Sequence, residues 1–197
     1  RVVGMIGAGV QAKAQLLGLS RHFKIEHVII FDTSQERSQS LERECREFLD
    51  CEYMIGSKPQ EACQCDILVT TTPSRRPVVK DRWVLPGTHI NAIGADAKGK
   101  QELEATLTKR AKIFVDDMAQ AVHSGEVNVP ISEGELLPEN IYAEIGHVLA
   151  GKKTGRESDK EITIFDSTGL GIQDVATGFA VYENALQTRR GTKLPLA

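Results

Sequence analysis

Short apolar runs alternate with longer amphipathic stretches along the whole chain. Seven runs have the length and apolar content of buried strands: Val2–Ile6, His27–Phe31, Glu52–Ile55, Asp66–Thr70, His89–Ile93, Lys112–Val115 and Glu161–Phe165. Six stretches have helical spacing or helix-forming composition: Gln11–Arg21, Ser34–Leu49, Gln101–Arg110, Ala119–Ser124, Ile141–Ala150 and Ile172–Thr188. This alternation predicts an α/β fold, a doubly wound and mostly parallel sheet covered by helices on both faces.

The segments between these elements indicate a single domain. Thr33 or Ser34 is placed to start the second helix, and Asp174 lies near the start of the last one. The stretch Gly125–Asn140 is rich in Gly, Pro and Glu and shows no clear period, so we interpret it as a long surface loop. The sequence contains no internal repeat and no interdomain linker, which makes residues 1–197 one domain.

Composition and charge narrow the possible partners. The 197 residues are 41% hydrophobic and 26% charged, as in an ordinary globular domain. A net charge of -3 does not give the basic surface of a nucleic-acid binder. The chain has neither an apolar run of about 20 residues nor a signal peptide, so we expect no membrane contact and a cytoplasmic location. The four cysteines match no zinc-site spacing, and we expect reduced thiols and no metal.

A glycine pattern follows the first predicted strand and opens the first predicted helix. Gly7 permits a tight turn, Gly9 allows the backbone to approach a pyrophosphate, and Ala12 keeps the helix close to the sheet. Val10 and Gln11 stand at the start of the helix, where free N–H groups and the helix dipole favour phosphate. The order of strand, glycines, helix and second strand predicts a dinucleotide-binding domain of the Rossmann type.

Asp32 ends the second predicted strand, 20 residues after Ala12. A carboxylate at this position accepts hydrogen bonds from the adenosine ribose and repels a 2′-phosphate, so NAD is preferred over NADP. The alternative is that Asp32 only caps the following helix.

Polar residues at the ends of two further strands are candidate ligand contacts. Thr71 and Thr72 follow the fourth predicted strand, where they either line the ribose and phosphate side of the cofactor or form a simple turn before Pro73. The fifth predicted strand ends at Ile93, which we expect to contact the cofactor, and leads to Asp96. Asp96 is the best candidate for a proton-transfer residue, with a helix cap as the alternative interpretation.

Several longer blocks, taken together with the glycine pattern, resemble one family. They are Pro86–Asp96, Gly99–Leu103, Phe114–Asp117, Glu144–Gly146 with Gly151 and Lys152, and Ile164–Ala176. In this order they are similar to the ornithine cyclodeaminase/mu-crystallin family, and most similar to its archaeal-type alanine dehydrogenase branch. The resemblance covers nearly the whole chain.

The resemblance implies NAD-dependent hydride transfer at the α-carbon of an amino acid, through an imine. It implies that Asp96 is the catalytic acid/base near the substrate nitrogen and that Ser167 and Gly169 lie close to the nicotinamide. Alanine and pyruvate are the leading substrates. Ornithine cyclodeamination and ketimine reduction are alternatives on the same machinery, and a non-catalytic carrier of cofactor and small ligand, like mu-crystallin, is the alternative of another class.

The sequence departs from the family pattern at its beginning. It starts at Arg1, one residue before a predicted strand, and we interpret it as the NAD-binding part of a longer protein. Family members carry an N-terminal domain that grips the substrate carboxylate and helps to form a dimer. We therefore expect residues 172–197 to pack toward that domain, the full-length protein to be a homodimer, and the fragment alone to be a doubtful catalyst.

Histidines offer a weaker candidate for acid/base chemistry. His89 lies inside a predicted strand, so a packed structural role is favoured over a catalytic one.

Overall fold

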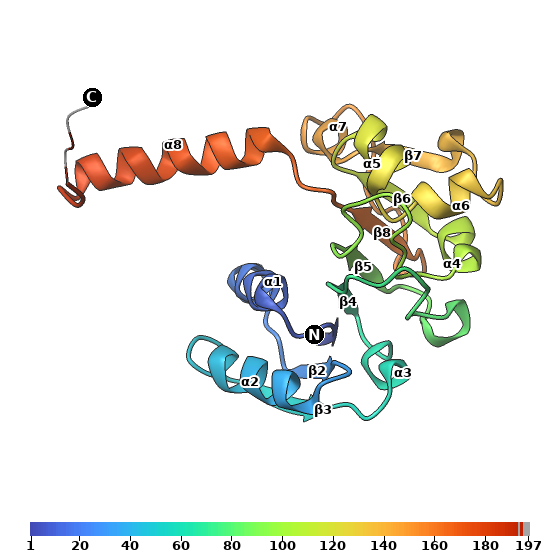
Figure 1. Cartoon of the computed structure of the whole chain (residues 1–197), viewed down its shortest axis with the longest axis horizontal. Helices are drawn as coiled ribbons and strands as arrows, with labels where there is room; N and C mark the ends of the chain where they lie inside the picture. The colour runs from blue at the N-terminus through green and yellow to red at the C-terminus, as the bar shows by residue number, and fades with distance from the viewer. Residues whose placement is uncertain (193, 195–197) are drawn as a thin grey trace.

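The computed structural model describes residues 1–192 and 194, and these form a single eight-stranded sheet with helices on both faces (Figure 1). The strands are β1 (Val2–Ile6), β2 (His27–Phe31), β3 (Glu52–Ile55), β4 (Ile67–Thr70), β5 (His89–Ala92), β6 (Lys112–Val115), β7 (Ile141–Glu144) and β8 (Thr163–Asp166). Their order is β3-β2-β1-β4-β5-β8-β6-β7, and neighbouring strands pair in parallel. The predicted fold class is confirmed.

Helices α1 to α7 lie between strands along the chain, as in a doubly wound sheet, and α8 follows the last strand. They are α1 (Val10–His22), α2 (Gln35–Cys45), α3 (Pro59–Ala62), α4 (Ala105–Arg110), α5 (Met118–Ser124), α6 (Asn128–Ser132), α7 (Ile145–Leu149) and α8 (Gly171–Gln187), with 3₁₀ turns η1 (Asp81–Trp83) and η2 (Pro138–Asn140). Ser34 caps α2, and its side chain accepts a hydrogen bond from the Arg37 N–H at 3.4 Å. The predicted start of this helix is therefore correct.

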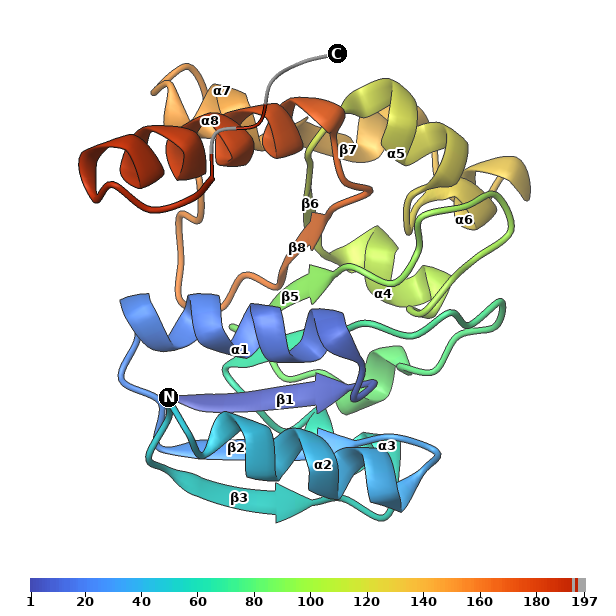
Figure 2. The same ribbon diagram turned by 60° about the vertical axis from the view of Figure 1, so that its left-hand side comes forward.

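Two apolar layers hold the helices on the sheet. On one face, Leu16 of α1 and Leu41 of α2 pack against β1, β2 and β4, and Figure 2 shows both helices on that side. On the other face, Ala62 of α3, Leu107 of α4 and Ala121 of α5 pack against the central strands. Burial of these side chains on both faces is the main stabilising contribution to such a sheet.

The structure corrects the predicted helix Ile141–Ala150. Its first four residues form β7, which pairs with β6, and only Ile145–Leu149 is helical. Ile141 and Ala143 are buried, and Tyr142 and Glu144, which alternate with them, are half-buried; this is the period of a strand. A short apolar run next to a helix does not distinguish the two periods, so the sheet has one strand more than predicted.

Two further expectations are wrong in part. The predicted helix Gln101–Arg110 begins only at Ala105, because Gln101, Glu102 and Leu103 run extended beside Val79 and are buried there. The predicted loop Gly125–Asn140 contains α6 and η2, with Val127 and Leu136 in the core. Tertiary packing overrides the local signal in both segments.

The last helix differs from the others. No residue of α8 is buried by the rest of the described chain, and the helix extends away from the sheet (Figure 1). Apolar side chains along it are exposed: Ile172 by 72%, Val175 by 72% and Phe179 by 60%. Among the described residues, no helix is both long and apolar enough to cross a membrane.

Candidate functional site

A cleft of about 470 Å³ lies at the carboxyl edge of the sheet, where β1 and β4 are neighbours. Here the chain turns from one half of the sheet to the other, which is the usual ligand position in open parallel sheets. The lining residues come from the loops after β1, β2 and β4: Ile6, Gly7, Ala8, Gly9, Phe31, Asp32, Thr33, Arg37, Thr71, Thr72, Pro73, Ser74 and Val78. Five of the predicted cofactor contacts are among them, namely Gly7, Gly9, Asp32, Thr71 and Thr72.

The glycine loop leaves the start of α1 open toward this cleft. Gly7 has φ of 97°, and a Cβ there would lie 2.7 Å from Thr71 Oγ1, so a side chain at this position is excluded by both conformation and space. Around Gly9 a Cβ would meet no atom within 4 Å. Among the described residues no side chain caps α1, and Val10 is 88% exposed. The free N–H groups of this helix start, with Gln11 exposed beside them, fit a phosphate group.

Asp32 joins the glycine loop to the turn after β2. Its Oδ2 accepts a hydrogen bond from the Ala8 N–H at 2.9 Å, and its Oδ1 accepts one from the Ser34 N–H at 2.8 Å. The carboxylate thus contacts the residue that caps α2 and also lines the cleft. Both interpretations of Asp32, as cap and as ribose acceptor, agree with this position, because a carboxylate has lone pairs for more than two donors.

The remaining predicted contacts lie farther along the same edge of the sheet. Ile93 follows β5, and its N–H donates to the Thr70 carbonyl at 2.9 Å. Ser167 follows β8, and its N–H donates to the Ala92 carbonyl at 3.1 Å. These bonds hold the ends of β4, β5 and β8 side by side, with Gly169 (φ 82°) two residues beyond Ser167. None of the three residues lines the 470 Å³ cleft itself.

Asp96 stands on the loop after β5. Its side chain is 58% exposed, and Lys100, four residues farther along the chain, donates a hydrogen bond to its Oδ1. Asp96 does not cap α4, which begins after Glu104. The position leaves a carboxylate at the carboxyl edge, free to meet a ligand that extends past β5.

Carboxylates that the sequence did not single out hold these loops. Asp116, after β6, accepts hydrogen bonds from the Thr168 N–H at 2.7 Å, the Gly169 N–H at 2.9 Å and the Ser167 hydroxyl at 3.2 Å. Glu102 holds the loops after β4 and β5 in the same manner. Their donors lie 8 to 53 residues away in the sequence, so no local pattern marks these acids. Arg37 of α2 also lines the cleft, and no motif in the sequence marks it.

Three of the acids behind the carboxyl edge are fully buried. Burial raises the pKa of Asp166 to about 7, and it also raises the pKa of Glu102. The pKa of Glu126 lies well above its ordinary value because of burial and the nearby charge of Glu102. The Oδ1 of Asp166 has no hydrogen-bond partner among the described residues. These acids form no group suited to hold a metal ion within the described part of the chain.

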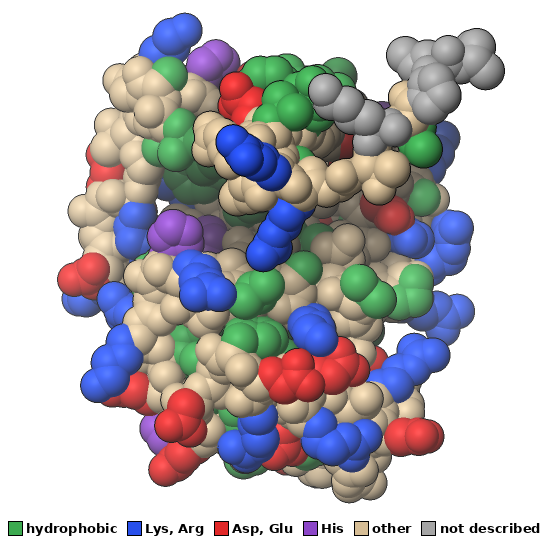
Figure 3. Space-filling view, turned by 90° about the vertical axis from the view of Figure 1, so that its left-hand side faces the viewer, with side chains coloured by type: hydrophobic (Ala, Val, Ile, Leu, Met, Phe, Trp, Pro, Cys, Tyr) green, Lys and Arg blue, Asp and Glu red, His purple; other side chains and the backbone are tan. Residues whose placement is uncertain are grey.

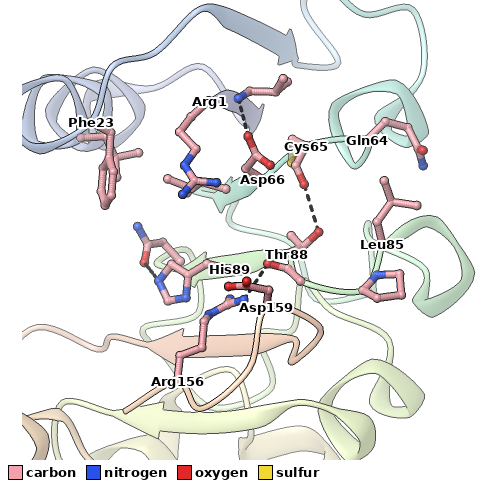
Figure 4. A pocket seen from close by; sticks show the side chains of 16 residues that line it. Arg1, Phe23, Gln64, Cys65, Asp66, Leu85, Thr88, His89, Arg156 and Asp159 are labelled. Carbon is pink, nitrogen blue, oxygen red and sulfur yellow. Dashed lines mark hydrogen bonds between the residues drawn. The ribbon is translucent and has the colours of Figure 1, made fainter.

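A second hollow, of about 700 Å³, opens at the opposite, amino edge of the sheet (Figure 4). Several of its polar side chains bond to one another or to nearby backbone. Thr88 Oγ1 donates to the Cys65 carbonyl at 3.0 Å, Asp66 Oδ2 accepts from the Val2 N–H at 2.8 Å, and His89 bonds to Thr163 Oγ1 and Asn91 Oδ1 at 2.7 and 3.0 Å. These contacts give His89 the packed position expected for it, far from the glycine loop.

The face that carries α1, α2 and α8 shows acidic and basic side chains interspersed in its lower part (Figure 3). This distribution agrees with the small net charge of -3. An electrostatic field that steers a polyanion toward a protein requires charges of one sign clustered on one surface.

Comparison with known proteins gives one consistent result. Residues 1–189 match the model of the ornithine cyclodeaminase/mu-crystallin family. An alanine dehydrogenase of Archaeoglobus fulgidus is 53% identical over 194 residues, which cover 98% of this chain and 59% of that protein.

Solved structures agree with the sequence relatives. An archaeal alanine dehydrogenase dimer with bound NAD superposes with a TM-score of 0.91 at 51% identity, over 100% of this chain and 61% of that one. A Δ¹-pyrroline-2-carboxylate reductase of Thermococcus litoralis, in complex with NADH and L-proline, gives a TM-score of 0.95 at 34% identity, over 98% and 61%. The chain therefore spans about three fifths of the length of these relatives.

Proposed function

Since the chain belongs to the ornithine cyclodeaminase/mu-crystallin family, we propose that it is the NAD-binding part of an oxidoreductase that acts on the C–N bond at the α-carbon of an amino acid. The observation that carries this proposal is the open start of α1 above Gly9, beside the carboxylate of Asp32. A solved relative at 51% identity has NAD bound, and another has NADH. NAD is preferred over NADP because Asp32 repels a 2′-phosphate.

The residues of the cleft fit the parts of the cofactor in order. The N–H groups at Gly9, Val10 and Gln11 bind the pyrophosphate, and Asp32 accepts hydrogen bonds from the adenosine ribose. Thr71 and Thr72 line the path toward β5. The nicotinamide then lies near Ile93, Ser167 and Gly169. When bound, the reduced cofactor supplies a hydride to the carbon of an imine.

Asp96 transfers the proton that accompanies this chemistry. A carboxylate on the loop after β5 is placed to give a proton to the substrate nitrogen in one direction and to accept it in the other. Lys100, hydrogen-bonded to Asp96, holds the carboxylate in position. Alanine and pyruvate with ammonia are the proposed substrates, because the alanine dehydrogenase of Archaeoglobus fulgidus shares 53% of the aligned residues.

A cyclic imino acid is the second candidate substrate. The Thermococcus litoralis reductase, whose structure contains NADH and L-proline, shares the fold of this chain with a TM-score of 0.95. The two candidates differ in the source of the nitrogen: free ammonia completes the imine of pyruvate, whereas a cyclic imine already contains it.

The test uses the full-length protein with Asp96→Asn and with Asp50→Asn, an exposed acid distant from the site, as a matched control. NADH oxidation is followed with pyruvate and ammonia, and separately with Δ¹-pyrroline-2-carboxylate. We expect Asp96→Asn to lower kcat by about 100-fold or more and to leave the Kd for NADH unchanged. A kcat within threefold of the wild type on the preferred substrate would contradict the role of Asp96. Tight NADH binding by the wild type without turnover of either substrate would favour a carrier function.

We also propose that α8 packs on the part of the longer protein that lies outside this chain. Its exposed apolar residues recur at spacings of three and four along one face: Ile172, Val175, Phe179, Tyr182 and Leu186. About two fifths of the length of the relatives lies outside the matched part, which offers a partner for this face. Residues 193 and 195–197 of the predicted packing segment lie outside the described residues.

Hydrogen exchange on the full-length protein tests this packing, and a covered helix exchanges slowly over Gly171–Gln187. Fast exchange over this helix, as in an exposed helix, would contradict the proposed packing of α8.

We propose a homodimer for the full-length protein because the archaeal alanine dehydrogenase is a dimer. Light scattering of the full-length protein measures its molecular mass in solution, which should be twice that of one chain.

A further inference from the structure

The buried side chain of Glu102 connects two loops of the proposed site, the loop after β4 and the loop after β5. Its Oε1 accepts a hydrogen bond from the Thr72 N–H at 2.6 Å, and its Oε2 accepts from the Gly94 N–H at 2.9 Å and from the Thr70 hydroxyl at 2.7 Å. Thr72 belongs to the loop that lines the cleft, and Gly94 lies two residues before Asp96. One carboxyl group thus connects the cofactor loop with the loop that carries the proposed acid/base.

The three partners of this carboxyl group are all donors, which makes the residue type specific. A carboxylate offers two acceptor oxygens and no competing hydrogen, so it accepts from all three. A glutamine amide has one oxygen, and its NH₂ group would face at least one of the same donors. A buried donor left without an acceptor costs about 1 to 3 kcal/mol.

The backbone at Gly94 allows the Glu102 carboxyl group to approach closely. A Cβ at Gly94 would lie 2.6 Å from the Glu102 carboxyl and 2.2 Å from the Thr72 carbonyl, so only glycine fits between the two loops. The Glu102 side chain is fully buried. Its own backbone N–H, together with that of Leu103, donates to the buried Glu126 carboxyl at 3.0 and 2.6 Å. Glu102 is therefore fixed at both its backbone and its side chain.

We propose that Glu102 is a positioning residue that sets the distance between Asp96 and the bound nicotinamide. This inference rests on the proposed function, because it concerns the relative placement of its two reacting partners. Glu102 touches neither of them. It holds the Thr72 loop and the Gly94 loop in a single arrangement, and small displacements between reacting groups lower the rate of a chemical step steeply.

The proposal predicts a particular division between kcat and KM in the full-length protein. In Glu102→Gln the two loops lose their common anchor, while the pyrophosphate site at Gly9 and Val10 stays intact. We expect kcat to fall by about 30- to 100-fold and the KM for NADH to rise by no more than about threefold. Thr88→Val is the matched control, since it removes a buried side-chain hydrogen bond at the amino edge of the sheet. Its kcat should stay within about twofold of the wild type at temperatures below its Tm.

A milder variant keeps the test decisive if Glu102→Gln does not fold. Thr70→Val preserves the side-chain volume and removes only the hydroxyl donor to Glu102. We expect kcat to fall by about three- to tenfold with an unchanged KM for NADH. Rates of Glu102→Gln, or of Thr70→Val when the first does not fold, that match the Thr88→Val control would overturn this inference alone. A wild-type protein that does not bind NADH would contradict the proposed function, and the inference with it.

Discussion

The two edges of the sheet differ in the hydrogen-bonding groups that they leave free. At the amino edge, side chains such as Thr88 and His89 bond to one another or to nearby backbone, so several of the polar groups around the 700 Å³ hollow already have partners (Figure 4). At the carboxyl edge, the acids bond mainly to backbone N–H groups of the loops, and the start of α1 keeps its own N–H groups free. The smaller cavity is therefore the one that lies beside free N–H groups.

This difference shows why cavity size alone does not locate a site. The carboxyl edge concentrates positive-φ glycine, free helix N–H groups and an acid that faces the cleft, all within the loops after β1, β2 and β4. A glycine at positive φ occurs at both edges, so the distinguishing feature of the carboxyl edge is the start of α1, whose N–H groups no side chain of the described residues caps. Matched substitutions at the two edges separate their roles.

The largest expected effect comes from two glycines with positive φ. Gly7 has φ of 97° at the carboxyl edge, and Gly87 has φ of 88° at the amino edge, where a Cβ would lie 2.4 Å from the Asp159 carbonyl. Alanine at either position should lower the free energy of unfolding by roughly 1 to 3 kcal/mol. Only Gly7→Ala should also weaken NADH binding, by about 100-fold or more, since the added methyl group displaces Thr71 from the cleft.

Urea unfolding and calorimetric titration with NADH measure the two quantities separately. Equal NADH affinities for Gly7→Ala and Gly87→Ala would remove the functional distinction between the edges.

A smaller effect is expected from two acids that each accept a backbone N–H. Asp32 does so at the carboxyl edge and Asp66 at the amino edge, with distances of 2.9 and 2.8 Å. Asp32→Ser should narrow the preference for NADH over NADPH by about 30-fold, because the carboxylate no longer repels the 2′-phosphate. Asp66→Ser should leave the ratio of the two Kd values unchanged. A ratio that is the same in Asp32→Ser and in the wild type would contradict the ribose contact.

The smallest effect concerns pH. Burial raises the pKa of Asp166 to about 7, whereas the same carboxyl ionises near pH 4 in the unfolded chain. Between these values the folded state holds a proton that the unfolded state has released, so this residue makes the free energy of unfolding fall as pH rises. Burial lowers the pKa of His89 at the amino edge, and its contribution has the opposite sign: stability is lost as pH falls below about 6.5.

Asp166→Asn should therefore flatten the pH dependence of stability. The difference between wild type and variant should change by about 1 kcal/mol from pH 5 to pH 6, with the variant gaining relative to the wild type at the higher pH. Urea unfolding at the two pH values provides the measurement. Parallel curves for the two proteins would show that Asp166 is ionised in the folded state.

Much of the fold was predictable because its signals are local. Buried parallel strands such as Val2–Ile6 are continuous apolar runs, and Ser34 marks the start of α2 by its own side chain. β7 was missed because Ile141–Glu144 is short and runs directly into α7, where apolar spacing fits both periods. The local sequence predicts a helix over residues 101–104, but this segment is extended because it pairs with Val78 and Val79.

Part of the candidate site also has local sequence signals. Gly7, Gly9 and Asp32 form a local pattern whose spacing follows from the geometry of a dinucleotide, and the cleft contains all three. Glu102 and Asp116 were missed as anchors because the N–H groups that donate to them belong to other loops. The residues around each acid in the sequence do not indicate which distant N–H groups it will bind. Such contacts follow from the strand order, which the local sequence does not specify.

A crystal structure of the chain with NAD would locate the cofactor directly. We expect the pyrophosphate in hydrogen-bond contact with the N–H groups at the start of α1, the adenosine ribose on Asp32, and the nicotinamide beside the loop that carries Asp96. NAD in the amino-edge hollow near His89, or a carboxyl-edge cleft that stays empty at saturating NAD, would contradict this placement.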